Sequence, residues 1–317
     1  MLNLELIAVI GFVLAAYSIV ANDAIQTLGT FLSSNAHRPW WVLWLFAITV
    51  LTVVMVWGWA TANGDVAYGR LSKFPEPEFG IQWWHAIPPL IILILTRFGI
   101  PVSTTFLVLT VFAPINLAPM VTKSLLGYLI AFVVGILVFR FVTHQLEARF
   151  RSKPVDRSRQ FWVVAQWAST AFLWSQWLMH DLANIFVYMP RQLELPHLIG
   201  ALLVLYVLHA YLFANRGGTI QKIVLSKTNT TDIRSATIID LIYGLVLFVF
   251  KEMNNIPMST TWVFLGLLGG RELAIAWFEQ HRSLRESFNL VISDGAKAAA
   301  GLGISIVLAL TLPEIMG

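Results

Sequence analysis

Long apolar runs alternate with short polar segments along the whole chain. A run of about 20 apolar residues is long enough for a helix to cross the hydrocarbon core of a membrane. We therefore predict six membrane-crossing helices, at residues 2–32, 41–60, 121–142, 161–189, 198–213 and 290–312. The pattern indicates an all-α polytopic membrane protein.

Two further apolar stretches are each interrupted by the same motif, Pro-x-Ser-Thr-Thr, at residues 101–105 and 257–261. The apolar arms on either side of the motif cover, in chain order, residues 84–95, 104–115, 236–250 and 260–278. The arms around the first motif are near or below the length at which a helix crosses a bilayer. This length favours a re-entrant helical hairpin that is buried in protein.

Each motif places a proline and three hydroxyl residues at the start of an apolar arm, which is typical of a helix N-terminus. Such a terminus leaves backbone N–H groups unpaired and carries the positive end of the helix dipole, so it can bind an anion without a basic side chain. Plain N-capping is compatible with this role, because a cap occupies only some of the free N–H groups. We expect one shared anion site built from Ser103, Thr104, Thr105, Ser259, Thr260 and Thr261.

The first apolar run contains a polar island from Asn22 to Thr27. A continuous helix over residues 2–32 would be about 45 Å long, against a hydrocarbon core of about 30 Å. We therefore expect the helix to break near Asn22 and Asp23. The run carries Glu5 and exceeds the length of a signal-peptide core, so we interpret it as a retained membrane helix.

Two aspartates within apolar runs, Asp23 and Asp181, are the main candidates for ion coupling, because ionisable groups at membrane depth are costly to keep. Their amide and hydroxyl neighbours provide the oxygen ligands that suit a small cation, and a carboxylate can equally carry a proton. The alternative is an aspartate that caps a broken helix or pairs with a lysine. The candidate coupling-cation set is Asn22, Asp23, Gln26, His180, Asp181 and Asn184, with Thr30, Lys123 and Lys297 as possible secondary members.

The two halves of the chain repeat each other. Asp181 follows Asp23 by 158 positions and Ser259 follows Ser103 by 156, which indicates an internal duplication. Each copy has three crossings plus one re-entrant hairpin, and an odd number of crossings inverts the second copy. We expect two inverted-topology repeats separated by a basic cytoplasmic linker, at residues 1–142, 161–317 and 143–160 respectively.

Composition agrees with a membrane protein, since the 317 residues are 57% hydrophobic and only 12% charged. The net charge of +4 follows from the positive-inside rule, so we expect no nucleic-acid partner. With the basic linker in the cytoplasm, the other basic loops also lie inside and both termini lie outside the cell membrane. The absence of cysteine excludes disulfides, thiolate metal sites and cysteine nucleophiles.

At these motifs the chain resembles the inorganic phosphate transporter (PiT) family of cation-coupled symporters, whose repeats each carry a G-A-N-D-V-A-N-like and a P-V-S-T-T-H-like motif. Residues 21–23, with Gly29 and Thr30 after them, match the first motif, and residues 101–105 match the second. The second half matches at Asp181, Ala183, Asn184, Pro257, Ser259, Thr260 and Thr261. The four motif sites occur in the family's order and span nearly the whole chain.

The resemblance implies that the two hairpin tips bind a tetrahedral oxyanion and that the protein forms a homodimer. It implies further that the coupling cation, with Na⁺ as one possibility, is bound by Asn22, Asp23, Asp181 and Asn184. The chain departs from the family pattern where asparagines are replaced by Gln26 and His180 and where histidines are replaced by Phe106 and Trp262. Because histidine titrates near neutral pH, His180 raises the hypothesis of proton coupling, against the alternative of a neutral hydrogen-bond donor.

These observations lead to one main functional hypothesis, a cation-coupled secondary transporter that carries a small inorganic oxyanion, phosphate first, by alternating access. The alternatives are a sulfate or bicarbonate transporter on the same scaffold, or an uncoupled anion channel or sensor. We expect no enzyme activity and no organic cofactor, with Na⁺ or H⁺ as the coupling ion. Asp240 lies in a hairpin arm and is not assigned to the site. A buried hydrogen-bond acceptor would favour protonated phosphate over sulfate, and Asp23, Asp181 and Asp240 are the candidates for it.

Overall fold

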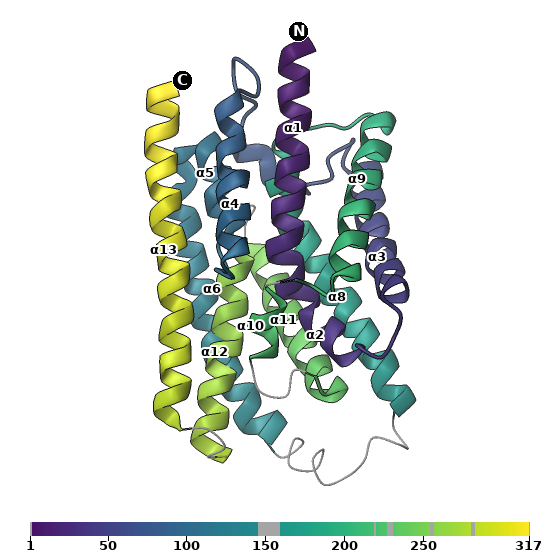
Figure 1. Cartoon of the computed structure of the whole chain (residues 1–317), viewed down its shortest axis with the longest axis vertical. Helices are drawn as coiled ribbons and strands as arrows, with labels where there is room; N and C mark the ends of the chain where they lie inside the picture. The colour runs from purple at the N-terminus through teal and green to yellow at the C-terminus, as the bar shows by residue number, and fades with distance from the viewer. Residues whose placement is uncertain are drawn as a thin grey trace.

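The computed structural model describes residues 2–144, 159–218, 220–226, 231–253, 257–279 and 283–316. In these residues every regular element is a helix, and the helices stand roughly side by side in one elongated bundle (Figure 1). Residues 145–158, which make up most of the predicted basic linker, lie outside the described residues.

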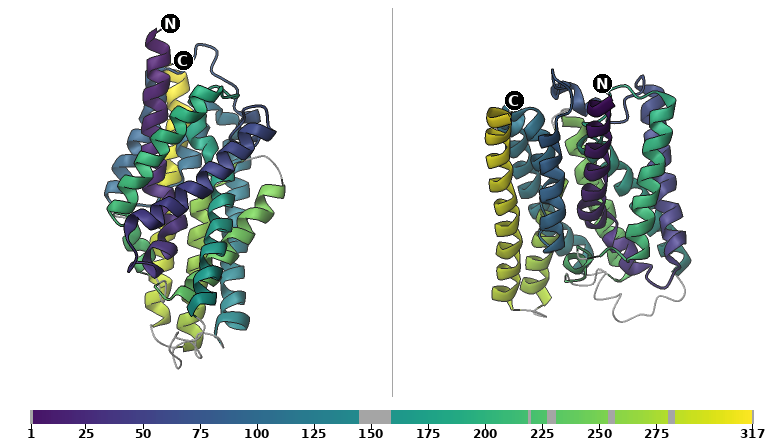
Figure 2. Two further views of the ribbon diagram at one scale, coloured as in Figure 1. Left: turned by 90° about the vertical axis from the view of Figure 1, so that its right-hand side faces the viewer. Right: turned by 45° about the horizontal axis from the view of Figure 1, so that its top comes forward.

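Helices occur at all six predicted crossings. The first crossing is divided into α1 (Leu2–Ile19), a π-helical turn η1 (Val20–Ala24) and α2 (Ile25–Ser34). The others are α3 (Trp40–Thr61), α6 (Leu117–Val138), α8 (Arg159–Phe186), α9 (Leu195–Ala214) and α13 (Leu284–Met316). Both chain ends lie at the same end of the bundle in every view (Figures 1 and 2).

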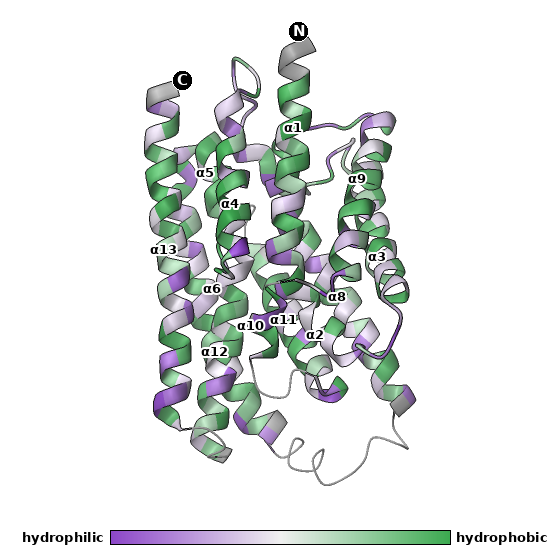
Figure 3. Cartoon of the chain, viewed as in Figure 1, coloured by the Kyte–Doolittle hydropathy of each residue, from purple (hydrophilic) through white to green (hydrophobic). Residues whose placement is uncertain are grey.

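Six helical stretches among the described residues are long and apolar enough to cross a membrane. They include five of the predicted crossings and α11 (Ile233–Met253). The sixth predicted crossing, α8, is absent from this set, and it carries polar residues such as Gln166, His180 and Asp181. At 28 residues it is nevertheless about 42 Å long, enough to cross. Apolar residues predominate along the helices (Figure 3), and with these six stretches the protein is an integral membrane protein of the predicted all-α class.

The expected break in the first helix takes a different form. The chain remains helical through Asn22 and Asp23, but η1 makes one wide π-helical turn there. A π turn shifts the backbone hydrogen bonds from four to five residues apart, and such turns are frequent at functional sites. Asn22 and Asp23, called the first acid motif below, therefore lie on a widened helical turn and not on an unwound segment.

Pairs of helices occur at both predicted hairpins, although α11 is long enough to cross a membrane. The first consists of α4 (Ile87–Arg97) and α5 (Thr104–Phe112), and the second consists of α11 and α12 (Thr260–Glu279). Figure 1 shows the first hairpin in the upper half of the bundle and the second in the lower half. The turn between α4 and α5 and the start of α12 meet near mid-height, which is where hydrogen bonds join them.

The helix pairs around the two hairpins correspond to each other. α12 packs along α6 and α5 packs along α13, while α11 packs along α8 and α4 along α1. Glycines allow the close approach of α6 and α12: a Cβ on Gly266 would meet the carbonyl oxygen of Tyr128, and one on Gly270 would meet that of Phe132. Small residues at such contacts are typical of membrane helix interfaces.

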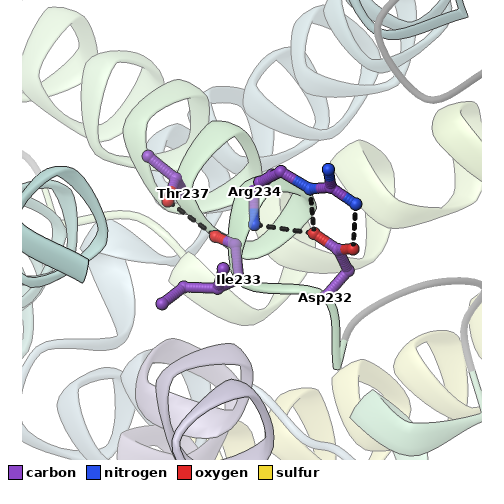
Figure 4. Close-up of polar contacts among 4 residues, drawn as sticks. All are labelled: Asp232, Ile233, Arg234 and Thr237. Carbon is purple, nitrogen blue, oxygen red and sulfur yellow. Dashed lines mark hydrogen bonds and ion pairs between the residues drawn. The ribbon is translucent and has the colours of Figure 1, made fainter. Parts of the chain in front are cut away.

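An ion pair fixes the start of the second hairpin (Figure 4). Asp232 Oδ1 accepts hydrogen bonds from the backbone N–H of Arg234 at 2.8 Å and from its Nε at 3.1 Å. Asp232 Oδ2 accepts from Arg234 Nη2 at 2.9 Å. Burial alone would raise the pKa of Asp232, but these bonds to Arg234 hold the pKa below its ordinary value.

Candidate functional site

The π-helical turn η1 presents the first acid motif to the tip of the first hairpin. Asn22 and Asp23 are buried, and Asn22 Nδ2 donates to Asp23 Oδ1 at 2.6 Å and to the carbonyl oxygen of Val102 at 2.8 Å. Gln26 Nε2 lies one turn later and donates to Asp23 Oδ1 at 3.3 Å. These bonds tie the first acid motif to the first hairpin tip.

The two Pro-x-Ser-Thr-Thr segments, residues 101–105 and 257–261, are called the hydroxyl motifs, and their serines are helix caps. Ser103 Oγ accepts from the backbone N–H of Phe106 at 3.2 Å, and Ser259 Oγ accepts from that of Trp262 at 3.3 Å. The capping interpretation is thus correct for both serines. Each cap occupies one N–H group, which leaves other N–H groups at the helix start for an anion. Phe106 and Trp262 themselves pack edge to face, with ring centroids 5.6 Å apart.

The threonines of the same motifs join the two halves of the chain. Thr104 donates to Asp23, Thr105 Oγ1 donates to Asp181 Oδ1 at 3.2 Å, and Thr261 Oγ1 donates to Asp23 Oδ1 at 3.4 Å. Residues 181–184 of α8 are called the second acid motif. Both acid motifs and both hydroxyl motifs therefore share one buried network.

The two hairpin tips bind each other reciprocally. Thr105 Oγ1 lies 3.3 Å from the carbonyl oxygen of Met258, and Thr261 Oγ1 lies 3.1 Å from that of Val102. Because each hydroxyl has one proton, that proton is shared between the carbonyl oxygen and the aspartate. Thr261 follows Thr105 by 156 positions, and Met258 follows Val102 by the same number, so the two contacts are equivalent in the two halves. The tips thus meet through equivalent groups, as a two-fold relation between the halves requires.

The residues present fit a small cation. Asp23 and Asp181 are both fully buried and lie within electrostatic reach of each other, so a bound cation or a proton would relieve their repulsion. Asn184 Nδ2 donates to Asp181 Oδ1 at 2.8 Å, and its Oδ1 accepts no hydrogen bond from the described residues. The same holds for Gln26 Oε1 within the described chain. Buried carboxylate and amide oxygens of this kind are hard ligands that suit a monovalent or divalent cation.

The four remaining predicted residues lie on helices around this network. His180 Nε2 lies 2.9 Å from the carbonyl oxygen of Leu247, and Thr30 Oγ1 donates to Asp240 Oδ1 at 2.5 Å. Lys123 is buried on α6 beside Ser124, whose Oγ accepts from the N–H of Ser259 at 2.8 Å. Lys297 is half-buried on α13 and, among the described residues, has no hydrogen bond or ion pair with the network.

Asp240 and Arg70 are buried charged residues that the candidate set does not include. Asp240 is fully buried, and Thr170 Oγ1 of α8 donates to its Oδ2 at 2.5 Å, opposite the bond from Thr30. The sequence feature that indicates its burial is its position inside an apolar arm. Arg70 is also buried but lies in a polar segment, where the sequence gives no sign of burial.

A cavity of about 490 Å³ lies against the π-helical turn. It is lined by residues from the ends of α1, α4 and α9, among them Ala21, Thr96, Arg97 and Tyr211. Thr96 Oγ1 also donates to Asn22 Oδ1 at 3.4 Å, so the cavity wall contacts the acid motif directly. A small ion or oxyanion would fit within this volume.

No protein-family model matches the chain, and no curated protein matches it. Among solved structures, the chain is similar to one described as the sodium-dependent phosphate transporter, with a TM-score of 0.60 and 18% sequence identity. The alignment covers 99% of this chain and 100% of the other. At this identity the likeness shows that the two proteins share a fold over their whole lengths.

Proposed function

We propose that the chain is a sodium-coupled symporter of inorganic phosphate and a divergent relative of the PiT family. One observation carries the proposal: the acid motifs and hydroxyl motifs of both halves share a single buried hydrogen-bond network around Asp23 and Asp181. The fold shared with the sodium-dependent phosphate transporter supports it. The four family motifs give the same function by resemblance.

The coupling follows from how the hydroxyl groups are used. Thr104, Thr105 and Thr261 donate their hydroxyl protons to Asp23 or Asp181. Sodium bound at these carboxylates neutralises them and competes for the same oxygens. The threonine hydroxyls are then free to donate to an oxyanion, together with the N–H groups at the starts of α5 and α12. Cation binding thereby prepares the anion site.

Alternating access would follow from a two-fold relation between the halves. Residues 1–142 and 161–317 would form inverted repeats, and each would carry one hairpin from its own side of the membrane to the shared site. Each tip contact uses one threonine hydroxyl that also reaches an aspartate, so the proton can move between the two acceptors without loss of the helix packing. Movement of one repeat against the other would expose the site to each side in turn.

Uptake by proteoliposomes tests this function. Labelled phosphate should accumulate when an inward sodium gradient is imposed at constant pH, and sulfate and bicarbonate should compete weakly. Accumulation driven by a proton gradient alone would replace sodium with protons as the coupling ion. Preferred sulfate uptake would change the substrate, and flux that only equalises the anion would indicate an uncoupled channel.

We also propose that both termini lie outside the cell and that the protein is a homodimer, the first from the positive-inside rule and the second from the family resemblance. The absence of native cysteine makes the orientation easy to test. A single Lys73→Cys variant should react with an impermeant thiol reagent on intact cells. An Arg216→Cys variant should react only after the membrane is opened.

A further inference from the structure

Arg70 is a buried arginine delivered by a loop. It begins the short helix η2 (Arg70–Lys73), between α3 and α4, and its side chain is only 2% exposed. Its Nε donates to the carbonyl oxygen of Met179 on α8 at 3.0 Å, two residues before Asp181. A guanidinium is costly to bury unless negative charge lies nearby, so the position of Arg70 next to the Asp181 segment of α8 indicates that the two charges act together.

The loop before Arg70 has a fixed conformation that turns the arginine inward. Asp65 Oδ1 accepts from the N–H of Ala67 at 2.7 Å, and its Oδ2 accepts from that of Gly69 at 2.6 Å. Tyr68 and Gly69 both have left-handed backbones, with φ of 55° and 73°. A tyrosine seldom adopts this conformation, so the turn is specifically held. In contrast, Lys73 on the same short helix is exposed.

Lys123 supplies a second buried positive group on another side of the site. It is 5% exposed on α6, and its neighbour Ser124 accepts the N–H of Ser259 in the second hairpin tip. Arg70 lies within electrostatic reach of both Lys123 and Asp181. The two basic residues therefore border the acid motif of α8 and the second hydroxyl motif.

We propose that Arg70 and Lys123 form a basic wall of the oxyanion site and bind the transported anion beside Asp181. This inference rests on the proposed function. An oxyanion at the hairpin tips brings negative charge close to Asp23 and Asp181, and the wall offsets that repulsion. The planar guanidinium of Arg70 can donate two parallel hydrogen bonds to a tetrahedral oxyanion, whereas Lys123 acts as a point charge.

The test compares phosphate KM and sodium dependence of uptake in proteoliposomes for wild type, Arg70→Gln, Arg70→Lys and Lys123→Gln. We expect Arg70→Gln and Lys123→Gln each to raise the phosphate KM by at least about tenfold, the effect of a lost charged hydrogen bond. Arg70→Lys should recover part of that loss, because it keeps the charge although it loses the same Nε bond to Met179. The sodium dependence should stay near that of wild type.

Lys73→Gln is the matched control, since it removes a positive charge from the same short helix at the surface, and its KM should not change. Isothermal titration of purified protein with phosphate in sodium buffer gives a second readout that needs no transport. Unchanged phosphate affinity in both Arg70→Gln and Lys123→Gln, with wild type active, would overturn the basic wall and leave the symporter intact. Equal losses in Arg70→Gln and Arg70→Lys would overturn it too. A wild type that neither binds nor transports an oxyanion would refute the proposed function itself.

Discussion

Thr261 of the second hairpin donates a hydrogen bond to Asp23 of the first helix, 238 positions earlier in the chain, with Oγ1 and Oδ1 3.4 Å apart. Thr105 of the first hairpin makes the corresponding bond to Asp181 at 3.2 Å. Each hairpin thus contacts the acid motif of the other half. Any ion bound at one aspartate is linked through these hydroxyls to the opposite tip.

Removal of these hydroxyls should therefore affect both motifs. We expect Thr105→Val and Thr261→Val each to reduce sodium-driven phosphate uptake at least about tenfold, since a hydrogen bond to a charged group contributes about 1.5–3 kcal/mol. Initial uptake rates in proteoliposomes measure the loss. Thr110→Val is the control, because Thr110 Oγ1 bonds to the carbonyl oxygen of Phe106 in its own helix. Normal uptake by both tip variants would contradict the role of the threonines.

The two aspartates should be required for transport and dispensable for folding. Asp23→Asn and Asp181→Asn keep the size of the side chain and remove the charge that the cation needs. We expect uptake to be abolished while each variant elutes as a monodisperse species in detergent. The exposed Glu286→Gln serves as the control and should transport normally. Full activity in both aspartate variants would exclude these carboxylates as the cation site.

The close contact of α6 and α12 predicts a sharp difference between two glycines. A Cβ at Gly270 would overlap the backbone of Phe132, whereas one at Gly303 of α13 meets nothing within 4 Å. Gly270→Ala should lower the unfolding free energy by about 1–3 kcal/mol, as overpacking does. Gly303→Ala should leave it unchanged or raise it slightly. Thermal unfolding in detergent, followed by tryptophan fluorescence, distinguishes the two outcomes.

The sequence predicted much of this arrangement because its main signals are local. Apolar length gave the helices, and the repeated Pro-x-Ser-Thr-Thr letters gave both hairpin tips and their N-caps. The π-helical form of the turn at Asn22 could not be predicted, since it depends on a shift in backbone bonding that apolar patterning does not record. Nor could the burial of Arg70, because a polar loop that folds inward has the same composition as one that faces water.

The partners of side chains were the other part that sequence could not give. Asp240 was visible in an apolar arm, but its bonds to Thr30 and Thr170 come from three helices that meet only in the folded chain. Lys297 looked equivalent to Lys123 by position. In the structure Lys123 is buried, whereas Lys297 is half-buried.

The ion pair at the start of α11 should stabilise the fold in a pH-dependent way. Because the pKa of Asp232 is lower in the folded protein than in the unfolded chain, its contribution is complete above the unfolded pKa of about 4. The contribution disappears as the pH falls through the folded pKa. We expect Asp232→Asn to cost about 0.5–1 kcal/mol at pH 7 and progressively less below pH of about 4. Unfolding temperatures of both proteins across this range measure the difference. A gap that does not narrow at low pH would contradict the ionic origin.

His180 provides a specific test of the coupling ion, because it stands where the PiT motif has an asparagine. Because a carbonyl oxygen only accepts, the 2.9 Å contact with Leu247 requires a proton on Nε2, as in a hydrogen-bond donor. We expect His180→Gln to keep this donor and therefore to retain sodium-driven uptake with the same pH profile as wild type. His180→Leu, which cannot donate, should lower uptake equally at every pH. A pH profile that changes in His180→Gln, together with uptake driven by a proton gradient in wild type, would instead establish His180 as a proton carrier.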